Sequence, residues 1–179
     1  MVSAWVMAAP QWSPAKEKKF QAAIASVYSR PHLQNLPTLK PYQVDVLRQM
    51  IQQTTTFIDA PTGYGKSLIY FLFPFVLERF EAERHARIQQ ACIVVVTPFL
   101  ALMNDQMQAA ESKWGIKSRK LISEEWKNGK NIAERFNVYI KSELDKGTTT
   151  FFMCPEGFVE SGLGEFLAPS SDSLLAQVL

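Results

Sequence analysis

Cysteine and histidine are scarce in this sequence of 179 residues, which contains two of each. Cys92 and Cys154 lie in or beside apolar runs, so we interpret them as small buried hydrophobic residues in a reducing compartment rather than as a disulfide. His32 and His85 are far apart and have no cysteine or carboxylate partners at ligand spacing. The sequence therefore predicts neither a disulfide nor a transition-metal site.

Long apolar runs are also missing, although 47% of the residues are hydrophobic. No run approaches the length that a bilayer requires, which argues against a transmembrane helix and against a membrane partner. The first 14 residues lack a basic start and contain polar breaks, unlike a secretory signal. We therefore expect an intracellular protein. Its formal net charge of +2 neither requires nor excludes nucleic acid, because a local basic groove can exist on a nearly neutral protein.

A glycine-punctuated loop that ends in Lys-Ser, residues 60–67 (APTGYGKS), is the most informative stretch of the sequence. A run rich in β-branched residues precedes it and a long helical pattern follows, which is the order that a phosphate site requires. Gly63 and Gly65 allow backbone conformations and a close approach that a side chain would obstruct. Loop N–H groups and the N-terminus of the following helix would then face the β-phosphate of a nucleoside triphosphate.

The side chains of this loop predict Mg²⁺ as a companion of the nucleotide. Lys66 would reach the β- and γ-phosphate oxygens, and the Ser67 hydroxyl would ligate the metal. Ala60 stands where the usual pattern has glycine, and the alternative is a glycine-rich turn with a chance Lys-Ser. The predicted cofactor-binding residues of the loop are Thr62, Gly63, Tyr64, Gly65, Lys66 and Ser67.

Strands and helices alternate along the sequence. Helical periodicity predicts helices over 15–28, 42–53, 67–90, 99–114 and 131–145, and Pro74 is expected to kink or interrupt the third of them. Apolar and β-branched runs predict strands over 54–59, 91–96, 117–122 and 148–153. This alternation predicts an α/β fold with a parallel sheet, flanking helices and right-handed crossovers. Residues 1–14 are expected to form a loosely ordered extension.

Four segments resemble the superfamily 2 helicases of the DEAD/DEAH type, and among them the RecQ-like branch. Segment 39–43 (LKPYQ) is similar to the upstream glutamine motif, and 60–67 to motif I, whose first residue is commonly not glycine. Segment 96–106 (VTPFLALMNDQ) is similar to motif Ia, and 151–156 (FFMCPE) to motif Ib. The resemblance implies a P-loop NTPase with a RecA-like fold, ATP and Mg²⁺ as cofactors, and DNA or RNA as partner. It also implies a nuclear protein in a eukaryote and a cytoplasmic one otherwise.

The resemblance implies roles for residues outside the loop. Gln43 would recognise adenine through the acceptor and donors of its amide, or it would be a surface residue of an amphipathic helix. Thr97 and Pro98 follow a buried strand, where open α/β sheets place their binding crevices, and would hold a nucleic-acid phosphate. Thr97 would otherwise be the N-cap of a helix.

Three further residues are predicted to contact nucleic acid. They are Asn104, Gln106 and Pro155. Asn104 and Gln106 would otherwise be exposed polar residues of a helix, and Pro155 would only terminate a strand.

A second acidic motif that ATP hydrolysis needs in this family, Asp-Glu followed by Ala-His or similar, is absent. Its Asp holds Mg²⁺ and its Glu positions or deprotonates the attacking water, yet no Asp-Glu dipeptide occurs in the sequence. An apolar run at 173–179 (SLLAQVL) stands where the preceding strand is expected. We expect an N-terminal extension with a helix over 1–36 and an incomplete, truncated helicase ATP-binding domain over 37–179. No catalytic residue is identified beyond Lys66.

Several functions are compatible with these motifs. The first is the ATP- and nucleic-acid-binding portion of an ATP-dependent 3′-to-5′ DNA helicase, inactive on its own. The second is a non-catalytic nucleotide- or nucleic-acid-binding module or a truncated gene product. A nucleotide kinase would need an arginine-rich acceptor site, and only scattered arginine is present. A translocase of the chromatin-remodelling type shares the Leu-x-Pro-Tyr-Gln start, but the Asp105-Gln106 pair favours the RecQ-like branch.

Overall fold

A computed structural model of the chain describes residues 3–5, 12–52, 56–82, 90–122, 132–160 and 175–178. The chain divides into two compact units, Met1–Gln89 and Gln90–Leu179, and each is described by itself. Both units contain strands and helices, which alternate regularly in the second unit, and this confirms the predicted α/β fold.

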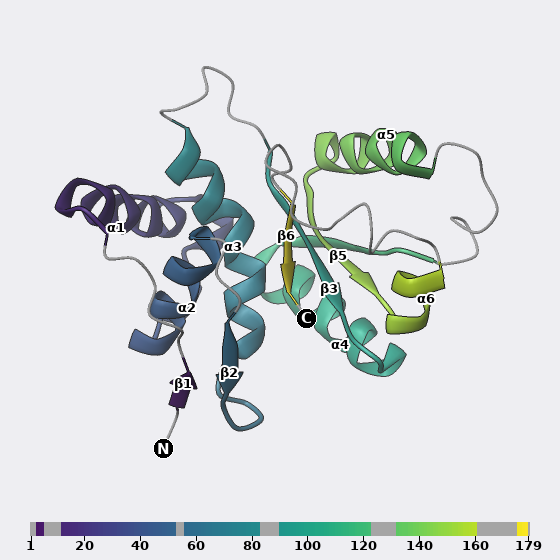
Figure 1. The fold of residues 1–179 in the computed structure, drawn as a ribbon, viewed down its shortest axis with the longest axis horizontal. Coiled ribbons are helices and arrows are strands. Elements are labelled where there is room, and N and C mark those ends of the chain that lie inside the picture. The colour runs from purple at the N-terminus through teal and green to yellow at the C-terminus, as the bar shows by residue number, and fades with distance from the viewer. Residues whose placement is uncertain are drawn as a thin grey trace. The chain divides into compact units, whose positions relative to one another are not determined.

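In its described residues, the first unit combines three α-helices and a short 3-10 helix with a two-stranded sheet (Figure 1). Strands β1 (Ser3–Trp5) and β2 (Phe57–Asp59) pair antiparallel, with Ser3 opposite Asp59. Helices α1 and α2 both pack against α3. The helices are α1 (Pro14–Tyr28), η1 (Pro31–Leu33, a short 3-10 helix), α2 (Pro41–Ile51) and α3 (Lys66–Glu81).

Local chemistry explains where these helices begin. Ser13 caps α1, because its hydroxyl accepts the N–H of Lys16 at 3.3 Å. Pro14 suits the first helical position, because it has no N–H that would need an acceptor. Along α3, residues 68–76 are all buried, as expected for a helix that is apolar on every side. Helix α3 is therefore the core helix of the first unit.

Three expectations for the first unit are wrong. Pro74 does not interrupt α3, because burial of the apolar side chains of the helix stabilises it by more than one missing backbone hydrogen bond costs, while the expected kink stays a prediction. It ends at Glu81, and residues 83–89 of the predicted helix lie outside the described residues. Residues 3–5 form a strand instead of a loose extension, because β2 offers them unpaired backbone groups. Strand β2 was expected in the parallel sheet, but its described partner is the antiparallel β1.

The second unit is built on a four-stranded sheet in the order β4-β5-β3-β6, and all neighbouring strands are parallel. This confirms the predicted parallel sheet. Strand β6 lies beside β3, where the apolar run at 173–179 predicted a strand. The strands are β3 (Cys92–Val96), β4 (Lys117–Lys120), β5 (Thr148–Met153) and β6 (Leu175–Val178).

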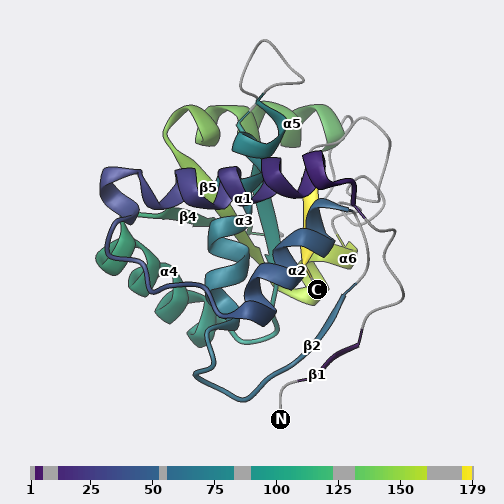
Figure 2. The same ribbon diagram turned by 90° about the vertical axis from the view of Figure 1, so that its left-hand side faces the viewer.

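Helices cover both faces of this sheet. Helices α4 (Leu100–Trp114) and α5 (Ile132–Asp145) lie on opposite faces (Figure 2). Right-handed crossovers require this, because the chain moves from β3 to β4 in one direction and from β4 to β5 in the other. A short helix, α6 (Pro155–Glu160), follows β5. One face forms a core of Cys92, Val94, Leu121, Phe136, Ile140, Phe151 and Met153.

Candidate functional site

The loop between β2 and α3 has two glycines in the left-handed region, Gly63 with φ 79° and Gly65 with φ 95°. Between them, the N–H of Tyr64 donates to the carbonyl of Pro61 at 3.3 Å and closes a tight turn. A Cβ atom at Gly65 would lie 2.8 Å from Nε2 of Gln43. Both the backbone conformation and this close approach therefore require glycine at position 65.

Lys66 is the first residue of α3 and has an exposed side chain. Its ammonium group donates to the carbonyl oxygens of Ala60 and Pro61, the second at 3.1 Å. The positive charge of Lys66 thus lies beside the first residues of the loop and next to the N-terminus of α3. An anion bound there would meet both an ammonium group and helix N–H groups.

Ser67, the predicted Mg²⁺ ligand, is half-buried on the first turn of α3 and hydrogen-bonded to Tyr70. Burial raises the pKa of Tyr70 to about 12, and the hydrogen bond with Ser67 lowers it in part. Tyr70 therefore keeps its proton at neutral pH. Thr62, on the other side of the glycines, is exposed.

Gln43 is 2% exposed, so the alternative of a surface residue on α2 is wrong. Its Oε1 accepts the backbone N–H of Lys40 at 2.7 Å, and its Nε2 donates to the carbonyl of Gly65 at 2.8 Å. The first bond belongs to a capping box, which occupies a backbone donor at the start of α2. The second bond ties this helix end to the phosphate loop.

Lys40 and Tyr42 also hold the loop, and sequence reasoning did not identify them. The Tyr42 hydroxyl donates to the carbonyl of Tyr64 at 2.8 Å, and Lys40 Nζ donates to the same oxygen at 3.2 Å. Lys40 Nζ lies 3.7 Å from the centroid of the Tyr64 ring, and the Tyr42 and Tyr64 ring centroids are 5.6 Å apart. We call Lys40, Tyr42 and Gln43 the 40–43 clamp. The available signal was the aromatic residue at position 64 of a loop otherwise built from small residues.

The predicted nucleic-acid residues lie in the second unit. Thr97 and Pro98 connect β3 to α4, and Pro155 opens α6 directly after β5. Val96 is paired with Met153, and the N–H of Thr97 donates to the Met153 carbonyl at 3.0 Å. The structure therefore brings these three residues together at the carboxyl edge of two adjacent parallel strands.

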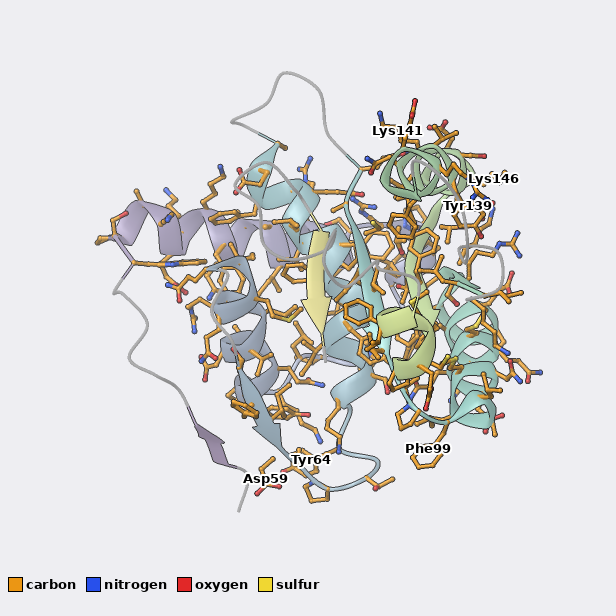
Figure 3. The ribbon with its side chains drawn as sticks, turned by 45° about the vertical axis from the view of Figure 1, so that its right-hand side comes forward. Asp59, Tyr64, Phe99, Tyr139, Lys141 and Lys146 are labelled. Atoms are coloured by element: carbon orange, nitrogen blue, oxygen red, sulfur yellow. The ribbon has the colours of Figure 1, made fainter. Side chains whose placement is uncertain are left out.

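Thr97 is 9% exposed and does not cap α4. Phe99 occupies the N-cap position, without a side-chain hydrogen bond, because the chain stays extended through Phe99 and turns into helix at Leu100. The alternative of Thr97 as a helix cap is thus wrong. Phe99 is 66% exposed and points away from the strands (Figure 3).

Asn104 and Gln106 lie within α4, farther along the chain than Thr97 and Pro98, which follow the end of β3. The side chain of Asn104 is exposed and that of Gln106 is half-buried. The structure does not place them beside Thr97, so their predicted role stays a prediction.

Two searches of the described residues give negative findings. No three His, Cys, Asp or Glu side chains within the described ranges form a group that could hold a metal ion. None of the helices described above is long and apolar enough to cross a membrane.

Comparison with known proteins gives two matches. The family model of the DEAD/DEAH box helicases matches residues 40–160, from the start of the 40–43 clamp to the end of α6. The ATP-dependent helicase SGS1 of Saccharomyces cerevisiae is 30% identical over 110 residues, which cover 62% of this chain and 7% of that protein. No solved structure matches the chain significantly.

Proposed function

The chain belongs to the DEAD/DEAH box helicase family, and from this we propose that it is the ATP- and nucleic-acid-binding part of an ATP-dependent DNA helicase. The family resemblance drawn from the sequence is thereby confirmed, and the family implies use of ATP with Mg²⁺ and binding of nucleic acid. Because the matched segment spans 7% of the yeast helicase, the RecQ-like branch and the 3′-to-5′ polarity are part of the proposal. So is an intracellular location, nuclear in a eukaryote and cytoplasmic otherwise.

The phosphate loop carries this proposal. Its two left-handed glycines leave the loop open to close approach, and Lys66 and the N-terminus of α3 add positive charge. The residues present therefore fit a nucleoside triphosphate. Residues 62–67 would hold the phosphates, the Ser67 hydroxyl would be the Mg²⁺ ligand, and Gln43 would lie near the adenine. Bound ATP supplies the phosphoanhydride bond that drives a complete helicase.

Calorimetric titration with ATP and Mg²⁺ tests the proposal. We expect saturable binding that Lys66→Ala weakens roughly 10- to 100-fold, because hydrogen bonds from a charged group contribute about 1.5–3 kcal/mol. Lys141→Ala, which removes an exposed lysine from α5, serves as the matched control and should bind like the wild type. Absence of wild-type binding, or equal binding by Lys66→Ala, would contradict the proposal.

The same protein should release no phosphate from ATP. Water attack on the γ-phosphate needs a carboxylate that positions or deprotonates the water, and the sequence contains no Asp-Glu dipeptide to supply it. Phosphate release by the 179-residue chain that Lys66→Ala abolishes would show that another residue does this work.

For nucleic acid, we propose the carboxyl edge formed by Thr97, Pro98 and Pro155, with Asn104 and Gln106 as further contacts. The first-turn N–H groups of α4 have no side-chain cap, so they are suited to a backbone phosphate of single-stranded or duplex DNA, or of RNA. This edge supports binding of the backbone rather than reading of a base sequence.

A further inference from the structure

We propose that Tyr42 is a positioning residue for nucleotide binding: its hydroxyl holds the Tyr64 carbonyl so that the N–H of Gly65 faces the phosphate chain. This inference rests on the proposed function, because it requires that the loop binds nucleotide phosphates. It assigns Tyr42 to the phosphates of the ligand and not to its base.

Peptide geometry carries the first step. In a planar trans peptide the C=O and N–H bonds point in opposite directions, and the described residues contain no cis peptide. Tyr42 and Lys40 draw the Tyr64 carbonyl toward the start of α2, at 2.8 and 3.2 Å. The N–H of Gly65 must therefore point away from α2.

Gln43 acts in the same way on the next peptide. The Gly65 carbonyl accepts the amide of Gln43 at 2.8 Å and the N–H of Leu68, in the first turn of α3, at 3.2 Å, so the N–H of Lys66 points away from both. Among the described residues, no backbone carbonyl in a turn, loop or helix cap accepts the N–H of Gly65 or the N–H of Lys66. The 40–43 clamp thus orients two successive donors that remain available to an anion.

The need for such a clamp follows from the residues around Tyr64. Tyr64 lies between two left-handed glycines, which allow this part of the loop many backbone conformations in the absence of other contacts. Its ring, 37% exposed, is also held, with the Lys40 ammonium 3.7 Å from its centroid. Donors fixed before the ligand arrives bind it more tightly, because less conformational entropy is lost on binding.

The state of the Tyr42 hydroxyl is suited to this role. Burial, and after it the neighbouring Tyr64, raise the pKa of Tyr42 above its ordinary value of 10.0. The hydroxyl therefore keeps the proton that it donates to the Tyr64 carbonyl throughout the neutral range. A different use of the same residue, stacking of the Tyr42 and Tyr64 rings on the nucleobase, predicts another pattern of binding.

Tyr42→Phe separates the two uses, because it removes the hydroxyl and keeps the ring. Calorimetric titrations with ATP–Mg²⁺ and with inorganic tripolyphosphate–Mg²⁺ compare a ligand that has a base with one that has none. We expect about 3- to 10-fold weaker binding of both, the loss expected for one hydrogen bond. Tyr139→Phe in α5, whose ring contacts Phe151, is the matched control, and thermal unfolding of both variants verifies their fold.

Each result of these titrations either supports or overturns the proposed role of Tyr42. Equal loss for ATP and tripolyphosphate supports the role in orienting the loop. A loss confined to ATP assigns Tyr42 to the base and overturns the inference, as does unchanged binding of both ligands. If the wild type binds neither ligand, the proposed function fails and this inference fails with it. Wild-type binding with an unaffected Tyr42→Phe variant overturns the inference alone.

Discussion

Gly65 combines two constraints that few residues of the chain share. Its φ of 95° disfavours any L side chain, and an added Cβ would meet Gln43 Nε2 at 2.8 Å. Gly63 and Gly147 also have positive φ, but an added Cβ would meet nothing within 4 Å at either position. Substitutions of these three glycines therefore distinguish the effect of backbone strain from the effect of displacing the 40–43 clamp.

We expect Gly65→Ala to lose about 1–2 kcal/mol of stability through backbone strain and to bind ATP–Mg²⁺ more weakly than the wild type. The added methyl group would push Gln43 away from the Gly65 carbonyl, which would then keep only the hydrogen bond from the N–H of Leu68. Chemical denaturation and calorimetry measure the two effects.

Gly147→Ala is the control for Gly65→Ala. It introduces similar strain between α5 and β5 and should leave ATP binding unchanged, while Gly63→Ala should fall between the two variants. Wild-type affinity in Gly65→Ala would show that the contact with Gln43 does not shape the phosphate site.

The contacts of some residues could be predicted from the sequence, and those of others could not. The glycines and Lys66 follow from a local pattern, because loop conformation and charge are properties of a few neighbouring residues. The burial of Gln43 and the hydrogen bond from Tyr42 to Tyr64 are contacts between a helix start and a loop about twenty residues later. Periodicity along one helix carries no information about such a contact.

Among the elements, the adjacent ends of β3 and β5 have the clearest functional consequence. Their parallel register pairs Val96 with Met153, so Thr97 and Pro155 follow adjacent strand ends, and α4 and α6 start nearby. Two neighbouring strand ends thus offer backbone N–H groups and a threonine hydroxyl along one edge.

We expect Thr97→Val to weaken binding of single-stranded DNA roughly 3- to 10-fold, because valine keeps the shape of threonine and removes a hydrogen-bonding group. Fluorescence anisotropy at fixed low salt measures this, because phosphate contacts weaken as salt rises. Ser112→Ala, which removes a hydroxyl near the far end of α4, should bind like the wild type. Equal affinities of all three proteins would remove Thr97 from the interface.

Elements with a strong local pattern were predicted well. Strand β5 was predicted over 148–153 and is found there, because it is apolar or β-branched throughout. Strand β1 was missed, since three residues have no pattern of their own and depend on pairing with β2. Helix α6 was not predicted, because six residues are too few for helical periodicity.

At the scale of the whole molecule, the chain divides into two compact units, and the edge that we propose for nucleic acid does not share a unit with the phosphate loop. The loop and the 40–43 clamp belong to the first unit, and the edge at Thr97 belongs to the second. The boundary predicted after residue 36 was not tested and stays a prediction.

Glu143 allows a test of what stabilises the second unit. Its side chain is buried, with Oε1 2.6 Å from Lys146 Nζ and Oε2 3.0 Å from Arg119 Nε and 3.2 Å from the Thr148 hydroxyl. The hydrogen bond from Lys146, with those from Arg119 and Thr148, lowers the pKa of Glu143 below its ordinary value of 4.5 against the opposing effect of burial.

Because this pKa is lowered in the folded state, the contribution of Glu143 to stability is complete above pH 4.5 and is lost as the pH falls through the folded-state value. We expect Glu143→Gln to lower the free energy of unfolding by about 1–3 kcal/mol at neutral pH. Below pH 4.5, the free energy of unfolding of this variant should fall less steeply with pH than that of the wild type. Urea denaturation at a series of pH values measures this. Glu134→Gln, at an exposed site on the same helix, should leave the profile unchanged, and ATP affinity at neutral pH should be the same in both variants.

The two occupied ends of the Gln43 amide have a consequence for any ligand that carries a base. A side chain that is 2% exposed cannot reach adenine without rotating, and rotation separates it from the Lys40 N–H or the Gly65 carbonyl. Base recognition and loop retention are then rival uses of one amide. If a nucleotide engages Gln43, an internal hydrogen bond is exchanged for an external one, so we expect this contact to add little net affinity and to release a hydrogen bond at the start of α2 or at the phosphate loop.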